Sequence, residues 1–376
     1  MSVKKKVVVT GANGLLGWHA CSRVYAKNCA ARFNNKSEPF ALTALGNREF
    51  NDDKTLQNAL SDADCVLHFA GMNRGADTAV EEANPTIAER LTSALKSTGS
   101  SPHIVYANSV HASLDNPYGR SKRIAGEILS SFGDKYTDMV LPHIFGEKAK
   151  PFYNNVTATL IQQLIDGSTP SVNPDGKVQL VHAGVAAQLA IEAGVQEKCG
   201  IIKPEATDLS VPDLLEKLIH FHKCYESDIF PNMDRSFDLA LFNTYRSAIY
   251  PHQCPRKLEL KSDIRGNLFE AVKGAGGQTF LSTTHPGVTR GNHFHIDKVE
   301  RFLVVKGDAI IRIRRVMSDK VSEYKVSGKN PSAVDIPTLH THSIENVGTD
   351  ELLTLFWSDS IFDPSNPDTF ADTVLS

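Results

Sequence analysis

The feature that most constrains this chain is a change in hydrophobic pattern along its length. Over roughly the first 190 residues, short apolar segments alternate with longer helical stretches, which is typical of a parallel sheet with crossover helices. From about Lys257 onward the apolar segments are short, stand at hairpin spacing and have no helical pattern between them, as in an antiparallel barrel or jelly roll. One core cannot contain both patterns, so the sequence predicts two domains of different architecture.

The predicted fold class is therefore α/β, a Rossmann-type doubly wound parallel sheet followed by an all-β jelly-roll domain. A chain of 376 residues is also too long for one ordinary core. We expect the first domain to span 1–250 and the second to span 257–376, with the boundary inside "NTYRSAIYPHQCPRKLEL".

Composition excludes several classes of partner. A net charge of −3, with 41% hydrophobic and 22% charged residues, is ordinary for a soluble globular protein and gives no reason to expect nucleic acid. The start "MSVKKKVVVTG" predicts a first strand rather than a signal peptide, and no 18-residue apolar stretch predicts membrane insertion. Six scattered cysteines without C-x-x-C spacing are expected to be reduced thiols of a cytoplasmic protein.

Three glycines in "TGANGLLG" follow the first predicted strand and indicate a nucleotide-binding turn. Gly11, Gly14 and Gly17 have the G-x-x-G-x-x-G spacing of short-chain dehydrogenases. Glycines allow a tight turn and let backbone N–H groups approach a pyrophosphate, which then lies at a helix N-terminus. Asn13 and Leu15 in the same turn are further candidate cofactor contacts. A tight β–α turn without a ligand is the alternative.

The end of the second predicted strand, "LGNREF", bears on the choice of cofactor. We find Arg48 there and no acidic residue in the usual ribose-binding place. An acid would hold the 2′-hydroxyl of NAD, whereas an arginine can pair with the 2′-phosphate of NADP. The sequence therefore favours NADPH, and a solvated surface arginine is the alternative.

A tyrosine and a lysine in "NSVHASLDNPYGRSK" form a candidate catalytic pair. Tyr118 and Lys122 are four residues apart in a predicted helix, so both side chains project from one face. A nearby ammonium lowers the pKa of a phenol from about 10, which lets the tyrosine exchange a proton with a ketone or alcohol. Ser109, on the loop after the fourth strand, is expected to hydrogen-bond the same oxygen.

Four candidate metal ligands lie in the second half of the chain. His293, His295 and Glu300 stand in "GVTRGNHFHIDKVERFLVVKG", which fits the first motif of the cupin family. His342 stands in "IPTLHTHSIEN", which fits the second cupin motif except that Leu339 replaces its central glycine. On a strand the first two histidines would point to the same side, so that the four residues can converge inside a barrel. Such ligands suit zinc, with nickel, manganese or iron as alternatives.

The role of this metal is open from the residues alone. Three histidines and a carboxylate can support oxygen chemistry, activate a ketone as a Lewis acid or brace the barrel, and a metal-free barrel with core histidines is a further alternative. His285 is a candidate proton acceptor and Arg290 a candidate diphosphate contact, with ordinary surface placement as the alternative for each.

If the first domain acts on a nucleotide-activated sugar, as the family resemblance described next implies, both domains can act on one substrate, a 4-keto-6-deoxy sugar nucleotide. The neighbouring ketone stabilises an enolate, so the protons at C3 and C5 are acidic. A base in the second domain could invert a ring carbon, and hydride delivery at C4 would then set the product.

From Lys6 to Ile191 the chain resembles the extended short-chain dehydrogenase/reductase family, most members of which act on nucleotide-activated sugars. Asn84 matches the asparagine of the following helix in that family. The chain departs from the family in "LPHIFG", which lacks the arginine often found before this run, so the corresponding substrate contact is not carried over. The resemblance implies a catalytic triad of Ser109, Tyr118 and Lys122, with Ala70 and Gly71 on the nicotinamide side.

The whole chain is similar to the bifunctional capsular-polysaccharide enzymes of the CapF type, through stretches such as "ASLDNPYGRSK", "KPFYNNVTATL", "TRGNHFH" and "FDPSNPDTF". This similarity implies that the cupin domain epimerises C3 of a UDP-2-acetamido-2,6-dideoxy-4-keto-hexose and that the reductase domain then reduces C4 with NADPH, on a route to N-acetyl-L-fucosamine. It also implies zinc in the cupin and a homodimer built largely through the barrels. By position, Asn154 and Asn155 become candidate substrate contacts, with loop capping as the alternative.

Other functions stay open at this point. The chain can be an NAD(P)-dependent sugar-nucleotide 4-epimerase or dehydratase whose cupin serves assembly or sensing. A dehydratase normally has acidic and basic groups next to the tyrosine, and "NPYGRSK" has none before Tyr118. A cupin oxygenase fused to a reductase would instead bind iron and consume oxygen.

Overall fold

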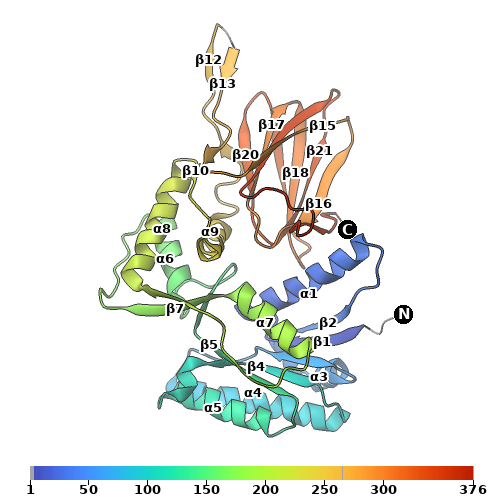
Figure 1. Cartoon of the computed structure of the whole chain (residues 1–376), viewed down its shortest axis with the longest axis vertical. Helices are drawn as coiled ribbons and strands as arrows, with labels where there is room; N and C mark the ends of the chain where they lie inside the picture. The colour runs from blue at the N-terminus through green and yellow to red at the C-terminus, as the bar shows by residue number, and fades with distance from the viewer. Residues whose placement is uncertain (1–3, 265, 376) are drawn as a thin grey trace. The chain divides into compact units, whose positions relative to one another are not determined.

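The computed structural model describes residues 4–264 and 266–375 (Figure 1). Its contacts form two compact units, Met1–Thr159 with Ser171–Leu214 and Leu160–Pro170 with Leu215–Ser376. The first unit contains a parallel sheet with helices, and the second contains antiparallel sheets. The predicted α/β fold followed by an all-β part is confirmed. The division of function between 1–250 and 257–376 stays a prediction.

A six-stranded sheet with the order β2-β1-β3-β4-β5-β8 forms the centre of the first unit. Every neighbouring pair of its strands is parallel. The strand order reverses beside β1, and in open α/β sheets nucleotides bind at the carboxyl ends of strands at such a switch point. The strands are β1 (Lys5–Thr10), β2 (Phe40–Leu45), β3 (Cys65–His68), β4 (His103–Ser109), β5 (Tyr136–Leu141) and β8 (Gly200–Ile202).

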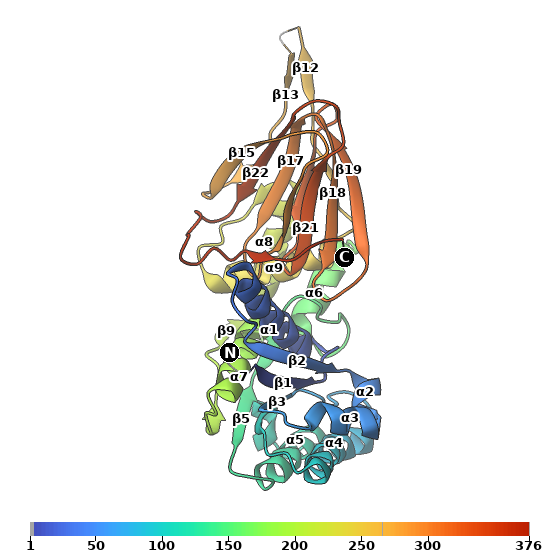
Figure 2. The ribbon, with the colours of Figure 1, turned by 90° about the vertical axis from the view of Figure 1, so that its right-hand side faces the viewer.

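Helices cover both faces of this sheet (Figures 1 and 2). The residues Val7–Val9 are fully buried because alternate side chains meet a different helical layer on each face. One layer consists of α1 (Leu15–Phe33) and α7 (Ala183–Val195), and the other of α3 (Asp53–Leu60), α4 (Asp77–Thr98) and α5 (Pro117–Ser130). Shorter elements of this part of the chain are α2 (Asn47–Asn51), η1 (Val110–Ser113), β6 (His143–Phe145), α6 (Val156–Ile165), β7 (Lys177–His182) and β9 (Thr207–Ser210).

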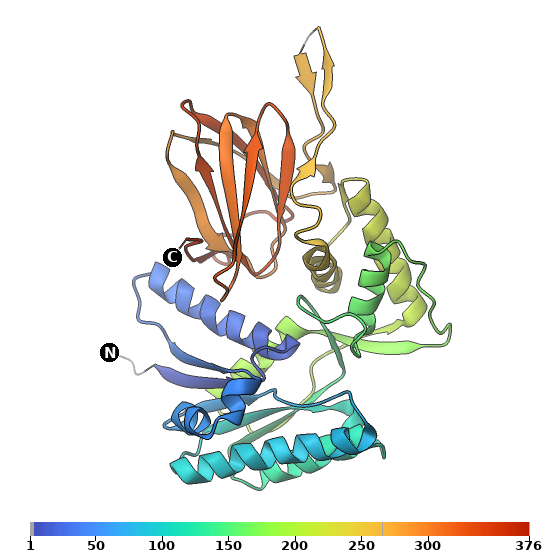
Figure 3. The same ribbon diagram turned by 180° about the vertical axis from the view of Figure 1, so that it is seen from behind.

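Two five-stranded antiparallel sheets form most of the second unit (Figure 3). Side chains such as Phe302 from one sheet and Ile311 and Ile344 from the other make a shared core, as in a β-sandwich. The first sheet has the order β11 (Arg256–Lys257), β20 (Ser332–Ile336), β17 (Glu300–Lys306), β22 (Leu352–Ser358), β15 (Gln278–Thr284), and the second β19 (Val321–Ser327), β18 (Asp308–Arg315), β21 (His340–Asn346), β16 (Thr289–Phe294), β23 (Phe370–Ala371).

A buried ion-pair network joins helical and strand residues within the second unit. Arg301 on β17 is 0% exposed and donates to both carboxylate oxygens of Asp335, at 2.6 and 3.0 Å. It also donates to Asp228, and the Tyr225 hydroxyl donates to Asp335 at 2.7 Å. Residues of α8 (Val211–Glu226) therefore pack against the sandwich. The remaining elements are α9 (Ser236–Ile249), β10 (Ile229–Phe230), β14 (Lys273–Gly274) and the hairpin strands β12 (Lys261–Asp263) and β13 (Gly266–Leu268).

Two further expectations concern the whole chain. All six cysteines are free, as the sequence predicted. Among the described residues, no helix combines the length and the apolar character needed to cross a bilayer.

The buried pair predicts a large stability difference between two arginine substitutions. Arg301→Met leaves the Asp335 carboxylate buried without its partner, so the free energy of unfolding should fall by about 3–5 kcal/mol. Arg312→Met removes pairs to the more exposed Glu323 and Glu345, and should cost about 1 kcal/mol or less. Urea midpoints analysed with a common m-value measure both. Equal losses in the two variants would contradict the assignment.

Candidate active site and metal centre

The glycine turn after β1 brings the backbone close to the end of β3. Gly11 has φ +66°, and a Cβ on it would lie 2.7 Å from the backbone nitrogen of Ala70. A Cβ on Gly17 would lie 2.2 Å from the Gly11 carbonyl oxygen, so only glycine lets α1 begin here. Gly14 is the N-cap of α1, and the first turn of the helix has no acidic residue. These features fit an anionic nucleotide group at the helix N-terminus.

The other predicted cofactor contacts lie around the same edge of the sheet. Asn13 is exposed in the turn and Leu15 is half-buried at the start of α1, while Ala70 and Gly71 follow β3 after one intervening residue. Their positions at the carboxyl ends of β1 and β3 fit the predicted roles.

The end of β2 carries an acid as well as an arginine. Arg48 is exposed on α2. Glu49 beside it is half-buried, and its Oε2 lies 2.8 Å from the place of a Cβ on Gly46. The predicted absence of an acidic residue at this strand end is therefore wrong, and the preference for NADPH depends on Arg48 alone.

Ser109 and Tyr118 meet at the carboxyl end of β4. Ser109 is the last residue of that strand, and its side chain forms a hydrogen bond with the phenol of Tyr118. The side chain of Asn116 caps α5 by accepting from the backbone N–H of Gly119 at 2.8 Å, and Pro117 occupies the first turn. The start of α5, and with it the phenol, is thereby held beside the serine.

Lys122 lies on the same helix but its amine is directed to β4. The Nζ atom donates to the carbonyl oxygen of Ala107 and lies 4.1 Å from the ring centroid of Tyr106. Burial lowers the pKa of the Lys122 amine to about 7, although the charge of Asp138 raises it. Burial also raises the pKa of Tyr118, partly opposed by the Ser109 hydrogen bond. The predicted lowering of the phenol pKa is therefore wrong for this geometry, because burial outweighs the effects that stabilise the phenolate.

Asn84 and Asp138 act on residues of α5. Asn84 contacts Ser121, and the charge of Asp138 acts on the Lys122 amine. Asn84 on α4 is 3% exposed, donates to Ser121 Oγ at 2.8 Å and accepts from the Met72 N–H at 3.0 Å, so it connects the loop after β3 to α5. The resemblance had pointed to Asn84, but sequence reasoning missed Asp138. The signal was an acidic residue inside the otherwise apolar strand segment "DMVLP".

The three predicted substrate contacts have different surroundings. Asn155 donates to the Ile144 carbonyl at 3.0 Å and accepts from the Ala158 N–H at 3.0 Å, so its amide caps the start of α6. Asn154 is exposed and donates to the Asn73 carbonyl at 2.7 Å. Arg290 is exposed on β16 and donates to the Thr284 hydroxyl at 3.1 Å.

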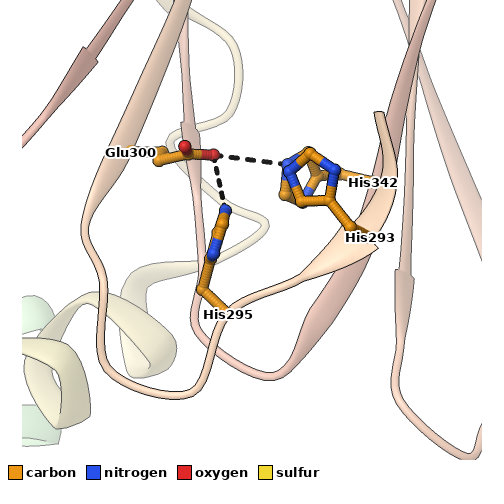
Figure 4. A group of neighbouring side chains, drawn as sticks. All are labelled: His293, His295, Glu300 and His342. Carbon is orange, nitrogen blue, oxygen red and sulfur yellow. Dashed lines mark ion pairs between the residues drawn. The ribbon is translucent and has the colours of Figure 1, made fainter. Parts of the chain in front are cut away.

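The four predicted metal ligands converge between the two sheets of the second unit (Figure 4). One potential ligand atom from each lies within 4.8 Å of the others. Glu300 Oε2 is 2.9 Å from His295 Nε2 and 3.3 Å from His342 Nε2. The rings of His293 and His342 have centroids 4.5 Å apart. Three of these atoms are buried, namely Glu300 Oε2, His295 Nε2 and His342 Nε2. None of the three has a hydrogen bond of normal geometry. Such convergence fits a divalent cation.

Backbone carbonyl groups orient two of these imidazoles. His295 Nδ1 donates to the Asp368 carbonyl oxygen at 2.5 Å, and His342 Nδ1 to the His340 carbonyl oxygen at 3.2 Å. With Nδ1 as the donor, the Nε2 atom of each imidazole, when neutral, presents its lone pair on the side of Glu300, which is the usual arrangement behind a metal-bound histidine.

Electrostatic effects favour an ionised Glu300 and a neutral His293. Burial raises the pKa of Glu300, but His295 and His342 outweigh it and hold that pKa well below the usual range. Burial, with His342 and His295, lowers the pKa of His293 to about 3. Burial opposes protonation of His295 too, but the Glu300 charge leaves its pKa raised. A divalent cation would replace the proton in this cluster.

The position of His295 depends on the C-terminal tail rather than on strand alternation. Strand β16 ends at Phe294 and its pairing with β21 is irregular between Gly291 and His293, so His295 already lies in the following turn. The Asp368 carboxylate accepts from three successive N–H groups of that turn, Ile296, Asp297 and Lys298, at 2.8 to 3.0 Å. Sequence reasoning missed Asp368, although it belongs to the "FDPSNPDTF" stretch.

Leu339 retains the backbone shape expected of a glycine. Its φ is +58°, in the left-handed region, and its N–H donates to the His295 carbonyl oxygen at 2.7 Å. The side chain is 1% exposed. The second motif therefore keeps its turn, with packing of the leucine offsetting a strain of about 1 kcal/mol.

Comparisons with known proteins cover nearly the whole chain. Residues 7–188 match the NAD dependent epimerase/dehydratase family, and residues 261–370 match the polysaccharide biosynthesis C-terminal domain. A curated relative from Pseudomonas aeruginosa, UDP-2-acetamido-2,6-β-L-arabino-hexul-4-ose reductase, is 32% identical over 98% of this chain and 99% of its own.

Solved structures agree with this result. The capsular polysaccharide assembling protein CapF from Staphylococcus aureus has a TM-score of 0.59 and 29% identity, covering 98% of this chain and 100% of that chain. A structure of CapF with the inhibitor 3-isopropenyl-tropolone has a TM-score of 0.53 and 27% identity, with the same coverage. UDP-N-acetylglucosamine 4-epimerase from Bacillus cereus, at 19% identity and a TM-score of 0.50 over 65% of this chain, shares the fold.

The left-handed backbone of Leu339 leads to a prediction for the replacement of this residue by glycine. Leu339→Gly relieves about 1 kcal/mol of strain but removes a buried side chain worth about 2–5 kcal/mol, so the variant should be less stable by about 1–4 kcal/mol. Met317 has a similar φ of +62° but is 44% exposed, so Met317→Gly should change stability by less than about 1 kcal/mol. Denaturant unfolding measures both. A gain in stability for Leu339→Gly would show that strain dominates.

Proposed function

The chain belongs to the CapF-type family of two-domain polysaccharide-biosynthesis enzymes, and on this premise we propose that it reduces the C4 ketone of a UDP-activated 2-acetamido-2,6-dideoxy-4-keto-hexose with NADPH. We further propose that its second unit, as a cupin, epimerises C3 of the same sugar before the reduction. The observation that carries the proposal is the full-length similarity to a UDP-2-acetamido-2,6-β-L-arabino-hexul-4-ose reductase. The product would enter capsular or surface polysaccharide synthesis.

Tyr118 is the proposed proton donor of the reduction. A nicotinamide cofactor, when bound, supplies the hydride to C4. The raised pKa of Tyr118 keeps its phenol protonated near neutral pH, which suits a group that donates a proton to the C4 oxygen. Ser109 hydrogen-bonds the phenol and would orient the same oxygen. Lys122, with a pKa of about 7, would bind the nicotinamide ribose when protonated.

The nucleotide would lie across the switch point of the parallel sheet. The turn formed by Gly11, Gly14 and Gly17 would hold the pyrophosphate at the start of α1, and Arg48 would pair with a 2′-phosphate. Asn13, Leu15, Ala70 and Gly71 would complete the cofactor contacts. Asn154 and Arg290 stay proposed substrate contacts, whereas the capping bonds of Asn155 favour a structural role for it.

The cluster of His293, His295, Glu300 and His342 would hold zinc. Such an ion, when bound, polarises a ketone oxygen and so acidifies the neighbouring ring proton. The inhibitor bound by the similar CapF structure is a tropolone, whose adjacent carbonyl and hydroxyl oxygens chelate divalent cations. This supports a metal in the family. A homodimer through the sandwich units is part of the same proposal.

A direct assay tests the function. The protein is incubated with the UDP-4-keto-6-deoxy-N-acetylhexosamine and either NADPH or NADH, and the sugar product is identified by NMR. We expect a C4-reduced sugar with an inverted C3 and a preference for NADPH. Conversion to a 4-epimer without net cofactor oxidation would instead support the 4-epimerase alternative, and oxygen consumption would support an oxygenase.

Removal of the phenol should separate the two activities. Tyr118→Phe should lower kcat for NADPH oxidation by about 100-fold or more, because the proton donor is lost. Affinity for NADPH and deuterium incorporation at C3 from D₂O should persist. Tyr25→Phe, on α1, is the control and should retain full activity. Loss of both activities in a folded Tyr118→Phe protein would contradict two independent sites.

Removal of one metal ligand should have the opposite effect. His342→Asn should lose the bound metal of the second unit and the deuterium incorporation, while NADPH binding is kept, because the ligand set falls from four to three. His340→Asn changes a histidine of the same strand outside the cluster and should keep both properties. Elemental analysis and NMR measure the two effects. Unchanged metal content in His342→Asn would refute the ligand set.

A further inference from the structure

A carboxylate lies next to the proposed catalytic residues of the first unit. Asp138 is on β5, where its register partner on β4 is Tyr106. Register partners of neighbouring strands direct their side chains to the same face of a sheet, so the carboxylate and the Tyr106 ring share a face. The Lys122 amine lies over that ring, 4.1 Å from its centroid. This face of the sheet therefore brings the carboxylate and the amine together.

Four further titratable groups lie around this amine, and each is neutral near pH 7. They are the phenols of Tyr106 on β4, Tyr118 on α5 and Tyr136 on β5, and the imidazole of His68 on β3. Burial raises the pKa of all three phenols and lowers the pKa of the imidazole to about 3. The negative charge that acts on the Lys122 amine comes instead from Asp138.

A second contact of Asp138 leads to the serine. Asn108 on β4 donates from its amide nitrogen to Asp138 Oδ2 at 3.2 Å, and its amide oxygen accepts from the Ser109 N–H at 2.8 Å. The Asn108 amide thereby fixes the backbone from which the Ser109 hydroxyl bonds Tyr118. The Tyr136 hydroxyl donates to the other carboxylate oxygen, Oδ1, at 3.3 Å. Both carboxylate oxygens are thus bonded, which holds the Asp138 side chain in one orientation.

A glycine of α5 lets both donors to Asp138 pack against that helix. A Cβ on Gly126 would lie 3.4 Å from Asn108 Nδ2 and 3.4 Å from the Tyr136 hydroxyl oxygen. Gly126 stands one helical turn after Lys122, so the two residues lie on the same side of α5. The surroundings of the carboxylate and the amine therefore belong to one interface between the sheet and the helix.

We propose that Asp138 is a positioning residue of the reduction, whose charge keeps Lys122 protonated and whose bond to Asn108 holds Ser109 in place. This inference rests on the proposed reductase function. Burial disfavours the charged form of an amine, so a buried lysine needs a nearby negative charge to keep its proton near neutral pH. A neutral Lys122 would bind the nicotinamide ribose less tightly. One carboxylate thus sets the charge of one catalytic residue and the place of another.

The first test is the pH dependence of NADPH binding to the full-length protein. Because the pKa of Lys122 is about 7, affinity should fall as the pH rises through 7 and the amine loses its proton. Asp138→Asn keeps the size of the side chain and removes its charge, so this fall should begin at lower pH. A pKa lower by about one unit reduces the protonated fraction at pH 7 from about one half to about one tenth, which weakens binding about fivefold. Fluorescence titrations between about pH 5 and pH 9 measure the midpoint.

Two further variants separate charge from position. Asp134→Asn removes an exposed carboxylate in the loop before β5 and should leave the midpoint of NADPH binding unchanged. Asn108→Ala frees the Ser109 backbone and should lower kcat of the reduction by about 10- to 100-fold, with the midpoint in place. An unchanged midpoint in Asp138→Asn, or an equal shift in Asn108→Ala, would overturn the assignment.

Urea unfolding tests the charge effect without cofactor or sugar. Burial lowers the pKa of Lys122 from 10.5 to about 7, so its contribution to stability is lost as the pH falls from 10.5 to 7 and is constant below that. In Asp138→Asn the folded amine has a still lower pKa, so the loss should continue below pH 7. The urea midpoint of this variant should therefore fall further behind that of the unaltered chain near pH 6 than near pH 9, where the folded amine is neutral in both proteins.

Equal differences in urea midpoint at the two pH values would contradict the charge effect. If Asp138→Asn unfolds near pH 6, recovery of its fold near pH 9 is the expected result in a stronger form. Failure of the proposed function looks different, because a protein that does not reduce the proposed sugar would still show this pH-dependent difference.

Discussion

The close approach of the β1–α1 turn to the end of β3 is the constraint on which the chemistry of the first unit depends. Gly11 touches the backbone of Ala70 so closely that no side chain fits between them. The Thr10 hydroxyl accepts from the Ala70 N–H at 3.2 Å and so holds the two strand ends together. The N-terminus of α1, Ala70 with Gly71, and the Ser109–Tyr118 pair all lie at or just after the ends of strands at this edge.

In the second unit the main physical constraint is different, because charged side chains are buried there. Arg301 is satisfied by two carboxylates and supports the sandwich from one side. Glu300 is its sequence neighbour but points to the other face of β17, where it meets imidazoles instead. Adjacent residues of one strand thus serve stability and a candidate metal centre. An acid at such a place is stable only with a cation or with protonated partners.

Some parts of the candidate site followed from local sequence, and others did not. The glycine spacing, the tyrosine–lysine pair and the four predicted ligands were all visible as short motifs. Asp138 and Asp368 were missed, because each acts through a side-chain contact made across the fold, whereas Glu49 stands in the "LGNREF" stretch itself. The predicted lowering of the Tyr118 pKa was also wrong, because burial raises that pKa. Spacing shows that a lysine is near, whereas burial and the direction of its amine depend on what packs around it.

The sequence by itself determined the two architectures and the residues that meet at each strand end, because hydrophobic period and glycine positions act locally. Only the tertiary structure decided which partners each buried charged group has. Leu339 illustrates the limit, since its left-handed backbone is supported by distant packing and not by its own preference. His19, Glu147 and His182 illustrate it further. His19 is 128 residues from Glu147 in the sequence and Glu147 is 35 from His182, and they become one cluster only when α1, β6 and β7 pack together.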